Sequence, residues 1–526
     1  MTKFHVKILS YFMINNIRSS HQLWLKIVII IVILFGVFFR VTNIDKKIYW
    51  HDEVYTSLRV SGYTEEYVTN QLSNGNLVTP KDIQKFLNLQ PETTFTDTLK
   101  VLKTAPEHPP LYYLSLRFVQ DIFGSSILVN RGVAVFFSLL CFPSIYWLSL
   151  ELFGNNFVAL ITLGFFSISP FHVLYAQEAR QYSLWTLTII LSLLFFLKAI
   201  KSNKKSHWLL YSATLTLSFY TALLSPLLFI TNTIYLYLSK LNFSRQIKNN
   251  FWFYSLISFI LFTPWAIIFI LNPLILVRRT NWLNQSSSID ELGFTLSKNF
   301  MRLFFDFPLD KRIFFSFALI LIYLILKTLL ILGKTTNKYK YIELYLILLI
   351  GIPLLALLLP DLIIGGRRSS ISRYLIPSYL GTHLVVGYFF YYKIDHYKSQ
   401  IWSIILVIIF TVSMTSNIML HNAEISWNKN HPSHPPQVSK IINQSEKPLL
   451  IASLEDNFSS IIALSYQLKL DVKLHLFQEN TELKYYPEFS PIYLFNPSPS
   501  LMNKVENVYN AKLEQKHKLV YQVVLQ

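Results

Sequence analysis

The amino-acid sequence predicts a polytopic α-helical membrane protein with about eleven transmembrane helices, a long first outer loop and a small C-terminal α/β domain. Three observations predict this class. Hydrophobic residues make up 52% of the 526 residues and charged residues only 14%, whereas a soluble domain carries about 25% charged residues. Apolar runs long enough to cross a bilayer recur along the chain. The basic residues, which give a formal net charge of +18, gather in short clusters between those runs, as membrane orientation requires, so we expect no nucleic-acid partner.

The predicted spans follow the apolar runs. Each needs about 17–25 residues, and one long run is divided in two near Ser225-Pro226 because proline breaks a helix. The resulting candidates are 23–40, 127–152, 157–175, 183–200, 207–221, 223–239, 251–273, 313–333, 342–364, 375–392 and 401–420.

Clusters of Lys and Arg set the predicted orientation. Residues 1–22, with Lys3, Lys7 and Arg18, form a cytoplasmic N-terminus before a retained signal-anchor. Residues 23–420 then form the transmembrane domain of an inner (plasma) membrane protein, in which 41–126 is the first periplasmic loop. Within that loop, 80–90, 96–104 and the run 111–123 are expected to be interfacial or re-entrant helices.

The tail, residues 421–526, has the character of a periplasmic α/β domain. It begins with a proline-rich linker at 431–436. Strand-like runs at 448–453, 472–477, 491–496 and 518–525 then alternate with helical stretches at 457–468 and 500–508. We find no motif there that indicates chemistry.

A pair of carboxylates, Asp52 and Glu53, follows the first span directly, beside Trp50 and His51. A carboxylate in that place can act as a general base on an attacking hydroxyl. The alternative is a solvated pair or a helix N-cap. The position at the membrane surface favours the catalytic interpretation.

Two further polar stretches fall on the same predicted side. Glu107 and His108 precede two prolines that fix a helix start, and could bind the acceptor or a divalent cation, although no tight ligand spacing supports a metal and its identity is unknown. The alternative is a solvated helix entry. Glu178 and Arg180, beside Tyr182, lie between the third and fourth spans. Arg180 could hold a phosphate and Glu178 could orient it or a sugar hydroxyl; the alternative is an ion pair that fixes two helices.

Three arginines, Arg367, Arg368 and Arg373, lie in a short outer loop before Tyr374. Arginines on the outer side run against the usual orientation bias, so we expect a local anionic partner. Guanidinium groups suit phosphate, and lipid head groups are the nonspecific alternative. Arg278 and Arg279 are weaker candidates for a similar part.

The sequence contains no glycine pattern for nucleotide binding. A donor sugar carried on a lipid phosphate would avoid that need.

These motifs together resemble the GT-C superfamily of membrane glycosyltransferases, specifically the family 39-like group that includes protein O-mannosyltransferases and the lipid A aminoarabinose transferase. The resemblance rests on Trp50-x-Asp52-Glu53, Glu107-His108-Pro109-Pro110, Gln177-Glu178-Ala179-Arg180-x-Tyr182 and Ser372-Arg373-Tyr374. It implies a GT-C fold over about residues 20–420, a polyprenyl-phosphate-linked donor and inversion at the anomeric carbon.

The resemblance also implies residue roles. It makes Asp52 the catalytic carboxylate, with Glu53 as its acceptor-side companion. It also makes Arg180 and Arg373 phosphate contacts. His108 stands where the aminoarabinose transferases have lysine, so neither their donor nor their acceptor is carried over.

The resulting hypothesis is an integral membrane glycosyltransferase that moves a sugar from a polyprenyl-phosphate donor to a lipid, glycan or protein acceptor of the cell envelope. Two alternatives remain: an oligosaccharide polymerase or ligase that uses lipid-pyrophosphate donors, and a transporter or flippase. Transporters tend to show internal repeats and broken mid-membrane helices, which we do not find in the sequence.

Overall fold

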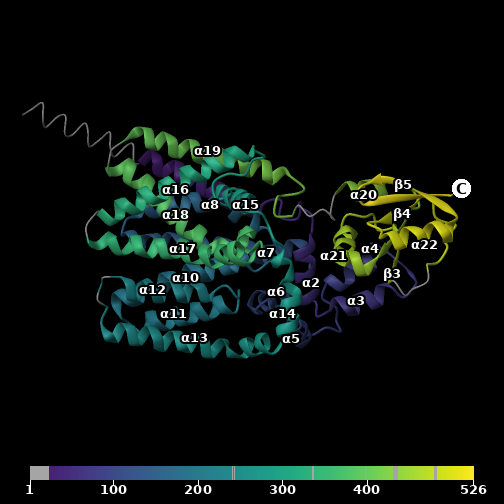
Figure 1. The fold of residues 1–526 in the computed structure, drawn as a ribbon, viewed down its shortest axis with the longest axis horizontal. Helices are drawn as coiled ribbons and strands as arrows, with labels where there is room; N and C mark the ends of the chain where they lie inside the picture. Colours follow the sequence, from purple (N-terminus) through teal and green to yellow (C-terminus); the bar gives the residue numbers. More distant parts are fainter. Residues whose placement is uncertain are drawn as a thin grey trace, which may run out of the picture.

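The computed structural model describes residues 23–525 apart from 240, 242, 335–336, 397–398, 430–435 and 479–482. The predicted cytoplasmic segment 1–22 and nearly all of the predicted linker lie outside the described residues. The chain forms a large helical bundle and a smaller α/β part beyond one end of it (Figure 1).

The bundle is built from long apolar helices and shorter helices that pack between them. These elements are the helix Leu23–Val41, α7 (Ile127–Phe153), α8 (Asn156–Ser167), α9 (Pro170–Ala176), α10 (Tyr182–Ser202), α11 (Lys205–Phe219), α12 (Pro226–Leu238), α13 (Arg245–Leu271), α15 (Ile289–Met301), α16 (Lys311–Lys334), α17 (Asn337–Ile364), α18 (Ile376–Tyr391) and α19 (Gln400–Asn422).

Every predicted span is helical, and the predicted fold class is confirmed. Among the described residues, seven helices are long and apolar enough to cross a membrane, and α8 with α9 forms an eighth candidate bent by 61°. The three remaining predicted spans, α11, α12 and α18, are shorter than a full span, at 15, 13 and 16 residues. A turn before Pro226 shortens α11 and α12. Helix α18 is buried over almost its whole length, so other helices, not lipid, surround it.

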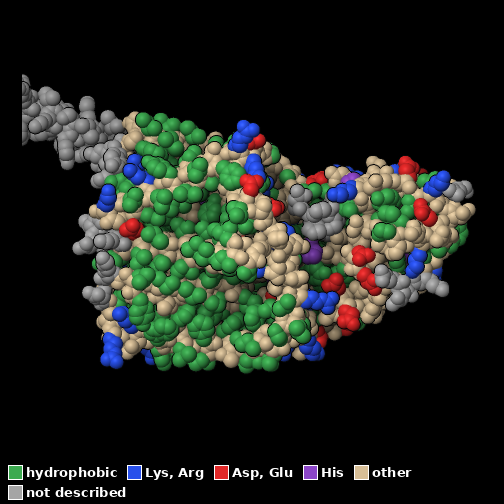
Figure 2. Space-filling view, in the orientation of Figure 1, with side chains coloured by type: hydrophobic (Ala, Val, Ile, Leu, Met, Phe, Trp, Pro, Cys, Tyr) green, Lys and Arg blue, Asp and Glu red, His purple; other side chains and the backbone are tan. Residues whose placement is uncertain are grey.

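The distribution of side chains on the surface of the bundle agrees with the prediction that its helices span a membrane. Hydrophobic side chains cover most of the visible face of the bundle, whereas Lys and Arg side chains gather toward its two ends (Figure 2). Such an apolar band between charged rims is what a bilayer requires.

The first outer loop is a folded layer of short helices. It contains α2 (His51–Val60), α3 (Glu65–Leu72), the short strand β1 (Leu77–Val78), α4 (Pro80–Gln84), η1 (Lys85–Leu87), α5 (Phe95–Lys103) and α6 (Leu111–Phe123). Thr79 and Thr94 begin α4 and α5 with capping boxes, each accepting from the third helical N–H. Helices α2, α5, α6 and α14 (Pro273–Thr280) lie at the end of the bundle nearest the α/β part (Figure 1).

The C-terminal part contains the predicted alternation of strands and helices. Its elements are α20 (Pro436–Asn443), β2 (Leu449–Ser453), α21 (Leu454–Ser465), β3 (Lys473–Phe477), β4 (Ile492–Phe495), α22 (Pro499–Tyr509), β5 (Ala511–His517) and β6 (Val520–Leu525). Two of these elements, α20 and β5, were not predicted. The sequence of β5, AKLEQKH, is largely polar and its strand is largely exposed.

The six-stranded sheet has the order β1-β3-β2-β4-β6-β5. Strands β3, β2 and β4 are parallel, and β4, β6 and β5 are antiparallel. The edge strand β1 comes from the first outer loop, where Leu77 pairs with His475. The loop and the tail therefore share one sheet, although 370 residues lie between the end of β1 at Val78 and the start of β2 at Leu449.

The tail also packs directly on α2. Val54 and Leu58 share an apolar core with Phe458 and Ile461 of α21, and the ring nitrogen Nδ1 of His51 lies 2.7 Å from the hydroxyl of Ser459. Burial of apolar area stabilises such a contact by about 25 cal/mol per Å². One face of α2 is thus held by the tail, and the opposite face is left to the bundle.

A close helix contact holds the first span. A methyl group built on Gly36 would lie 2.5 Å from the carbonyl oxygen of Ser167 at the end of α8, whereas one built on Gly132 in α7 would meet nothing within 4 Å. Glycine at position 36 therefore allows the helix that leads into α2 to approach the bundle closely.

We predict that Gly36→Ala destabilises the protein by about 1–3 kcal/mol through overpacking, whereas the matched control Gly132→Ala is neutral or slightly stabilising. Thermal unfolding of both variants in detergent would measure the difference. Equal midpoints for the two variants would contradict the proposed close contact.

Candidate functional site

The two adjacent carboxylates lie in the first turn of α2, where negative charge is favoured by the helix dipole. Successive side chains on a helix point about 100° apart. Asp52 therefore points toward Arg180 and Arg373, while Glu53 points into the protein interior toward Arg131.

Asp52 lies between two arginines. Its Oδ2 atom is 3.6 Å from Nη2 of Arg373 and 3.8 Å from Nε of Arg180, and its side chain is 15% exposed. Burial alone would raise the pKa of Asp52, but the positive charges of Arg180 and Arg373 outweigh it and lower the pKa to about 2. Asp52 is therefore ionised at neutral pH.

Arg180 is held in place by hydrogen bonds to α2 and to Tyr113. It lies in the turn between α9 and α10, and its Nη1 donates to the backbone oxygen of Asp52 (3.3 Å) and to the hydroxyls of Thr56 (3.2 Å) and Tyr113 (3.4 Å). The ring of Tyr182 lies 5.7 Å from the guanidinium carbon of Arg180 and 5.5 Å from that of Arg373. An aromatic face at these distances attracts both cations, so Tyr182 holds them side by side.

Several polar atoms around Asp52 are buried without a hydrogen-bond partner in the described part of the protein. They are Oδ2 of Asp52, Nε of Arg180, Nε of Arg373, Oε2 of Glu107, Nδ1 of His108 and Nη1 of Arg59. Most buried polar groups in proteins are hydrogen-bonded. A cluster of unmet donors and acceptors beside two guanidinium groups is therefore suited to an anionic, hydroxyl-bearing ligand. We call the set Asp52, Arg180, Tyr182 and Arg373 the Asp52 cluster.

Glu107 and His108 lie at the entry to α6. Oε1 of Glu107 is 3.6 Å from Nη1 of Arg279 on α14 and 3.7 Å from Nε2 of His108. Burial, reinforced by the surrounding arginines, lowers the pKa of His108 well below its ordinary value. His108 is therefore a neutral imidazole that can accept as well as donate a hydrogen bond.

The described residues contain no group of three or more His, Cys, Asp and Glu side chains arranged to hold a metal ion. The groups nearest to Asp52 are arginines, which disfavour a cation. The described residues around Asp52 therefore do not fit a divalent cation.

Glu53 is fully buried and fully engaged. Arg131 of α7 donates to both of its oxygens (2.7 and 2.8 Å), Lys429 donates to Oε2 (2.8 Å), and the N–H of Ala179 donates to Oε1 (3.0 Å). Burial would raise the pKa of Glu53, but Arg131 and Lys429 lower it to about 2. This environment fits a positioning role for Glu53 better than the predicted contact with an acceptor.

Glu178 belongs to the same interior network. It accepts a hydrogen bond from the side-chain amide of Asn428 (2.7 Å). Burial raises the pKa of Glu178 to about 8, helped by the neighbouring carboxylates and opposed by Lys429. The predicted role for Glu178 in binding a sugar or phosphate remains a prediction, and its contacts are with the segment that follows α19.

The three arginines predicted to bind an anion, in the loop before Tyr374, have different partners. Arg373 and Tyr374 reach the Asp52 cluster, where the Tyr374 ring lies 5.8 Å from the Arg373 guanidinium carbon. Arg368 instead forms an ion pair with Asp361 of α17 (3.0 Å), and Arg367 donates to Gln285 (3.1 Å) beyond η2 (Asn281–Asn284). Arg367 and Arg368 thus join two outer loops to each other.

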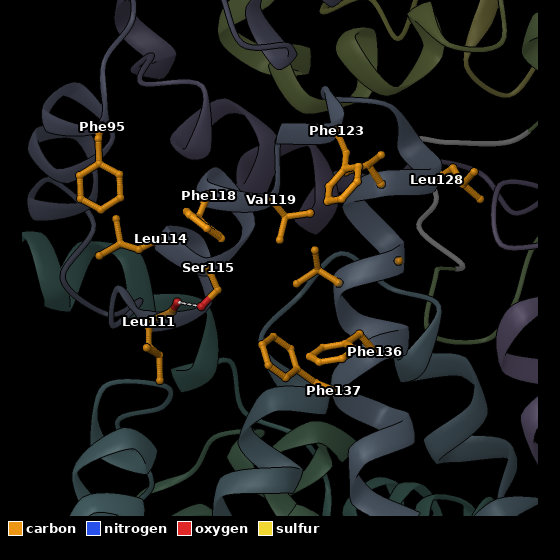
Figure 3. Close-up of a pocket in the computed structure, with 13 residues that line it drawn as sticks. Phe95, Leu111, Leu114, Ser115, Phe118, Val119, Phe123, Leu128, Phe136 and Phe137 are labelled. Carbon is orange, nitrogen blue, oxygen red and sulfur yellow. Dashed lines mark hydrogen bonds between the residues drawn. The ribbon is translucent and has the colours of Figure 1, made fainter. Parts of the chain in front are cut away.

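A separate groove of about 870 Å³ lies between α5, α6 and the start of α7 (Figure 3). Its lining is almost entirely apolar, with phenylalanines from all three helices, and the hydroxyl of its one serine, Ser115, donates to the carbonyl of Leu111 (2.8 Å). The groove contains none of the charged residues of the site, so we place the candidate chemistry at the Asp52 cluster.

Comparison with known proteins gives three results. Residues 107–268 match the family model described as dolichyl-phosphate-mannose-protein mannosyltransferase. No curated protein matches the sequence. Among solved structures, ArnT from Cupriavidus metallidurans bound to undecaprenyl phosphate is similar, with a TM-score of 0.53 and 11% identity over 94% of this chain and 97% of that chain.

The chain has the fold of the GT-C membrane glycosyltransferases. The apo structure of the same ArnT, with a TM-score of 0.50 and 11% identity over 79% of this chain and 87% of that chain, is also similar. The resemblance drawn from the sequence is thereby confirmed. The match to the family model includes Glu107, His108, Glu178 and Arg180. It therefore contains two of the four stretches singled out in the sequence, and the two stretches with Asp52 and Arg373 lie outside it.

The sequence analysis missed Arg131, Arg59 and Lys429. Arg131 carried a usable signal, since it is a charged residue near the start of the predicted span 127–152, and charges in spans are seldom accidental. Arg59 and Lys429 lie in polar segments, where nothing distinguishes a buried cation from a solvated one.

We predict that Glu178→Gln removes a pH-dependent loss of stability. The pKa of Glu178 is raised in the folded protein, which therefore binds a proton that the unfolded chain has lost, and stability falls as pH rises from about 4.5 to about 8. The midpoint of the glutamine variant should gain on that of the wild type between pH 5 and pH 8 in thermal unfolding. The same change at Glu424, whose side chain is 56% exposed, is the control; a parallel gain there would refute the assignment.

Proposed function

We propose that this protein is an integral membrane glycosyltransferase that transfers a sugar from a polyprenyl-phosphate donor to a lipid, glycan or protein acceptor of the cell envelope, with Asp52 as the general base. The GT-C fold supports a membrane glycosyltransferase. The undecaprenyl phosphate bound in the ArnT structure supports a lipid-phosphate donor. The observation that carries the proposal is a carboxylate between two arginines, with unmet hydrogen-bonding atoms on all three.

The donor phosphate would bind between Arg180 and Arg373. Guanidinium groups donate paired hydrogen bonds to phosphate oxygens, and the Nε atom of each arginine has no hydrogen-bond partner among the described residues. Tyr182 keeps the two cations at a fixed separation. As the bond between the anomeric carbon and the phosphate oxygen breaks, negative charge builds on the leaving phosphate, and both arginines stabilise it.

Asp52 would take the proton of the attacking hydroxyl. The acceptor oxygen forms a bond to the anomeric carbon, its proton moves to the Asp52 carboxylate, and the polyprenyl phosphate leaves. A carboxylate with a pKa near 2 is a weak base. A bound phosphate would neutralise the arginines that lower this pKa, so donor binding itself would make Asp52 a stronger base.

Glu107 and His108 would orient the acceptor. Oε2 of Glu107 and Nδ1 of His108 are buried without partners in the described protein, and a neutral imidazole with a carboxylate can bind hydroxyl groups as donor and acceptor. Glu53 would act on Asp52 through the position of α2, as its buried ion pairs indicate.

This assignment implies a location. A polyprenyl chain must remain in lipid while its phosphate reaches the Asp52 cluster, which lies at the end of the bundle nearest the tail (Figure 1). Together with the basic clusters between the spans, this supports an inner-membrane protein with a cytoplasmic N-terminus, and with the site and the C-terminal domain on the periplasmic side.

We predict that Asp52→Asn lowers the rate of transfer by at least about a hundredfold, because an amide cannot accept the proton. The enzyme purified in detergent would be assayed with undecaprenyl-phosphate-linked hexoses and pentoses by mass spectrometry of the products. Asp45→Asn, an identical change at an exposed residue before α2, should leave the rate unchanged. Transfer by Asp52→Asn at the wild-type rate would exclude Asp52 as the base.

We predict that Arg373→Gln weakens the binding of undecaprenyl phosphate about 10- to 100-fold. A charge-assisted hydrogen bond contributes about 1.5–3 kcal/mol, and each 1.4 kcal/mol corresponds to a factor of ten. Arg367→Gln, in the same loop but directed to Gln285, should change the affinity by less than about twofold. Equal losses in the two variants, measured by titration of tryptophan fluorescence, would argue against a phosphate site at Arg373.

A further inference from the structure

The segment that follows the last span, residues 424–429, lies beside α2, and Lys429 at its end is buried. Its backbone accepts a hydrogen bond from the N–H of Ile48 at Glu424 (3.2 Å), and a turn is closed by the N–H of Lys429, which donates to Ser426 (2.9 Å). The side chain of Ser426 donates to Asn428 (2.6 Å), which in turn donates to Glu178. The segment is therefore ordered by hydrogen bonds at both ends.

Lys429 is a buried cation, with a side chain that is 1% exposed. A lysine is almost never fully buried unless it is paired, and Lys429 is paired with Glu53 through a contact of 2.8 Å between Nζ and Oε2. The same carboxylate is held by Arg131, which also donates to the backbone oxygens of Ile44, Lys47 and Ile48. Glu53 and Arg131 thus connect three parts of the chain: the segment that follows the first span, the second span, and the segment that follows the last span.

The buried carboxylate of Glu53 is contacted by two cations from different elements. Arg131 donates to both of its oxygens and Lys429 donates to Oε2. A buried carboxylate that loses one of its partners is strongly destabilised. Without Lys429, Oε2 would keep Arg131 as its one side-chain donor among the described residues, and the first turn of α2 would be held less firmly. That turn sets the direction of Asp52.

We propose that Lys429 is a positioning residue for Asp52, and that the segment after the last span is in this way a part of the catalytic centre. Lys429 holds Glu53, Glu53 fixes the first turn of α2, and the turn directs the Asp52 carboxylate to the acceptor hydroxyl. Lys429 does not touch the substrate. The inference rests on the proposed function of Asp52, because it concerns the geometry of that base.

The test is a set of three variants of the full-length enzyme. Lys429→Met removes the charge and keeps the apolar stem, Lys429→Arg keeps the charge, and Lys469→Met is the matched control at an exposed lysine of the tail. Two quantities are measured for each: kcat with an undecaprenyl-phosphate-linked sugar that the wild type turns over, and the Kd of undecaprenyl phosphate.

We expect Lys429→Met to lower kcat at least about tenfold, because a small displacement of a catalytic group has effects of that size, while the Kd of undecaprenyl phosphate stays within about twofold. Lys429→Arg should restore most of kcat, and Lys469→Met should match the wild type. A purely structural role would instead lower the amount of folded enzyme and leave the kcat of the folded fraction unchanged.

Several results would overturn the proposal: wild-type kcat in Lys429→Met, equal loss of kcat and affinity, or failure of Lys429→Arg to improve on Lys429→Met. If Lys429→Met is not recovered as folded protein, Lys429→Gln replaces it, and misfolding of that variant as well would count as a structural role and against the proposal. Absence of transfer by the wild type with every sugar donor would overturn the proposed function itself, which separates the two failures.

Discussion

The buried carboxylate of Glu53 is the interaction on which the arrangement of the site depends. Three elements that are far apart in the sequence donate to it: Arg131 of α7, Ala179 before α10 and Lys429 after α19. A buried ion needs such compensation, since an unpaired one costs several kcal/mol. The first turn of α2 can therefore take this position only when the spans around it are correctly assembled, and Asp52 is in place as a consequence.

The neighbouring carboxylates illustrate how environment separates two chemically similar residues. Both oxygens of Glu53 accept hydrogen bonds from protein donors. Oδ2 of Asp52 has no hydrogen-bond partner among the described residues, although two guanidinium groups lie within 4 Å. Proteins usually satisfy buried polar groups. The unmet hydrogen-bonding capacity is therefore concentrated at Asp52, beside a carboxylate that is held rigidly.

Much of this could be predicted from the sequence, for physical reasons. Hydropathy located the long apolar helices of the bundle, because lipid allows few alternatives to an apolar helix, but it did not predict α15. The motifs containing Asp52, Arg180 and Arg373 lie together in the structure. The partners of Glu53 could not be predicted, because a charge in a polar segment such as Lys429 gives no local sign of burial. Arg367 and Arg373 lie six residues apart in one loop, yet only tertiary packing decides that Arg373 reaches Asp52 while Arg367 binds Gln285.

The strand contributed by the first outer loop has a consequence for biosynthesis. Leu77 and Val78 pair with β3, whose residues are synthesised almost four hundred positions later, so this layer cannot be completed while the ribosome is still making the spans. Contacts of such long separation form late in folding. The loop that bears Asp52 would thus gain its final support only after the carboxyl-terminal strands have been synthesised, and an unfinished chain would lack the completed sheet beside α2.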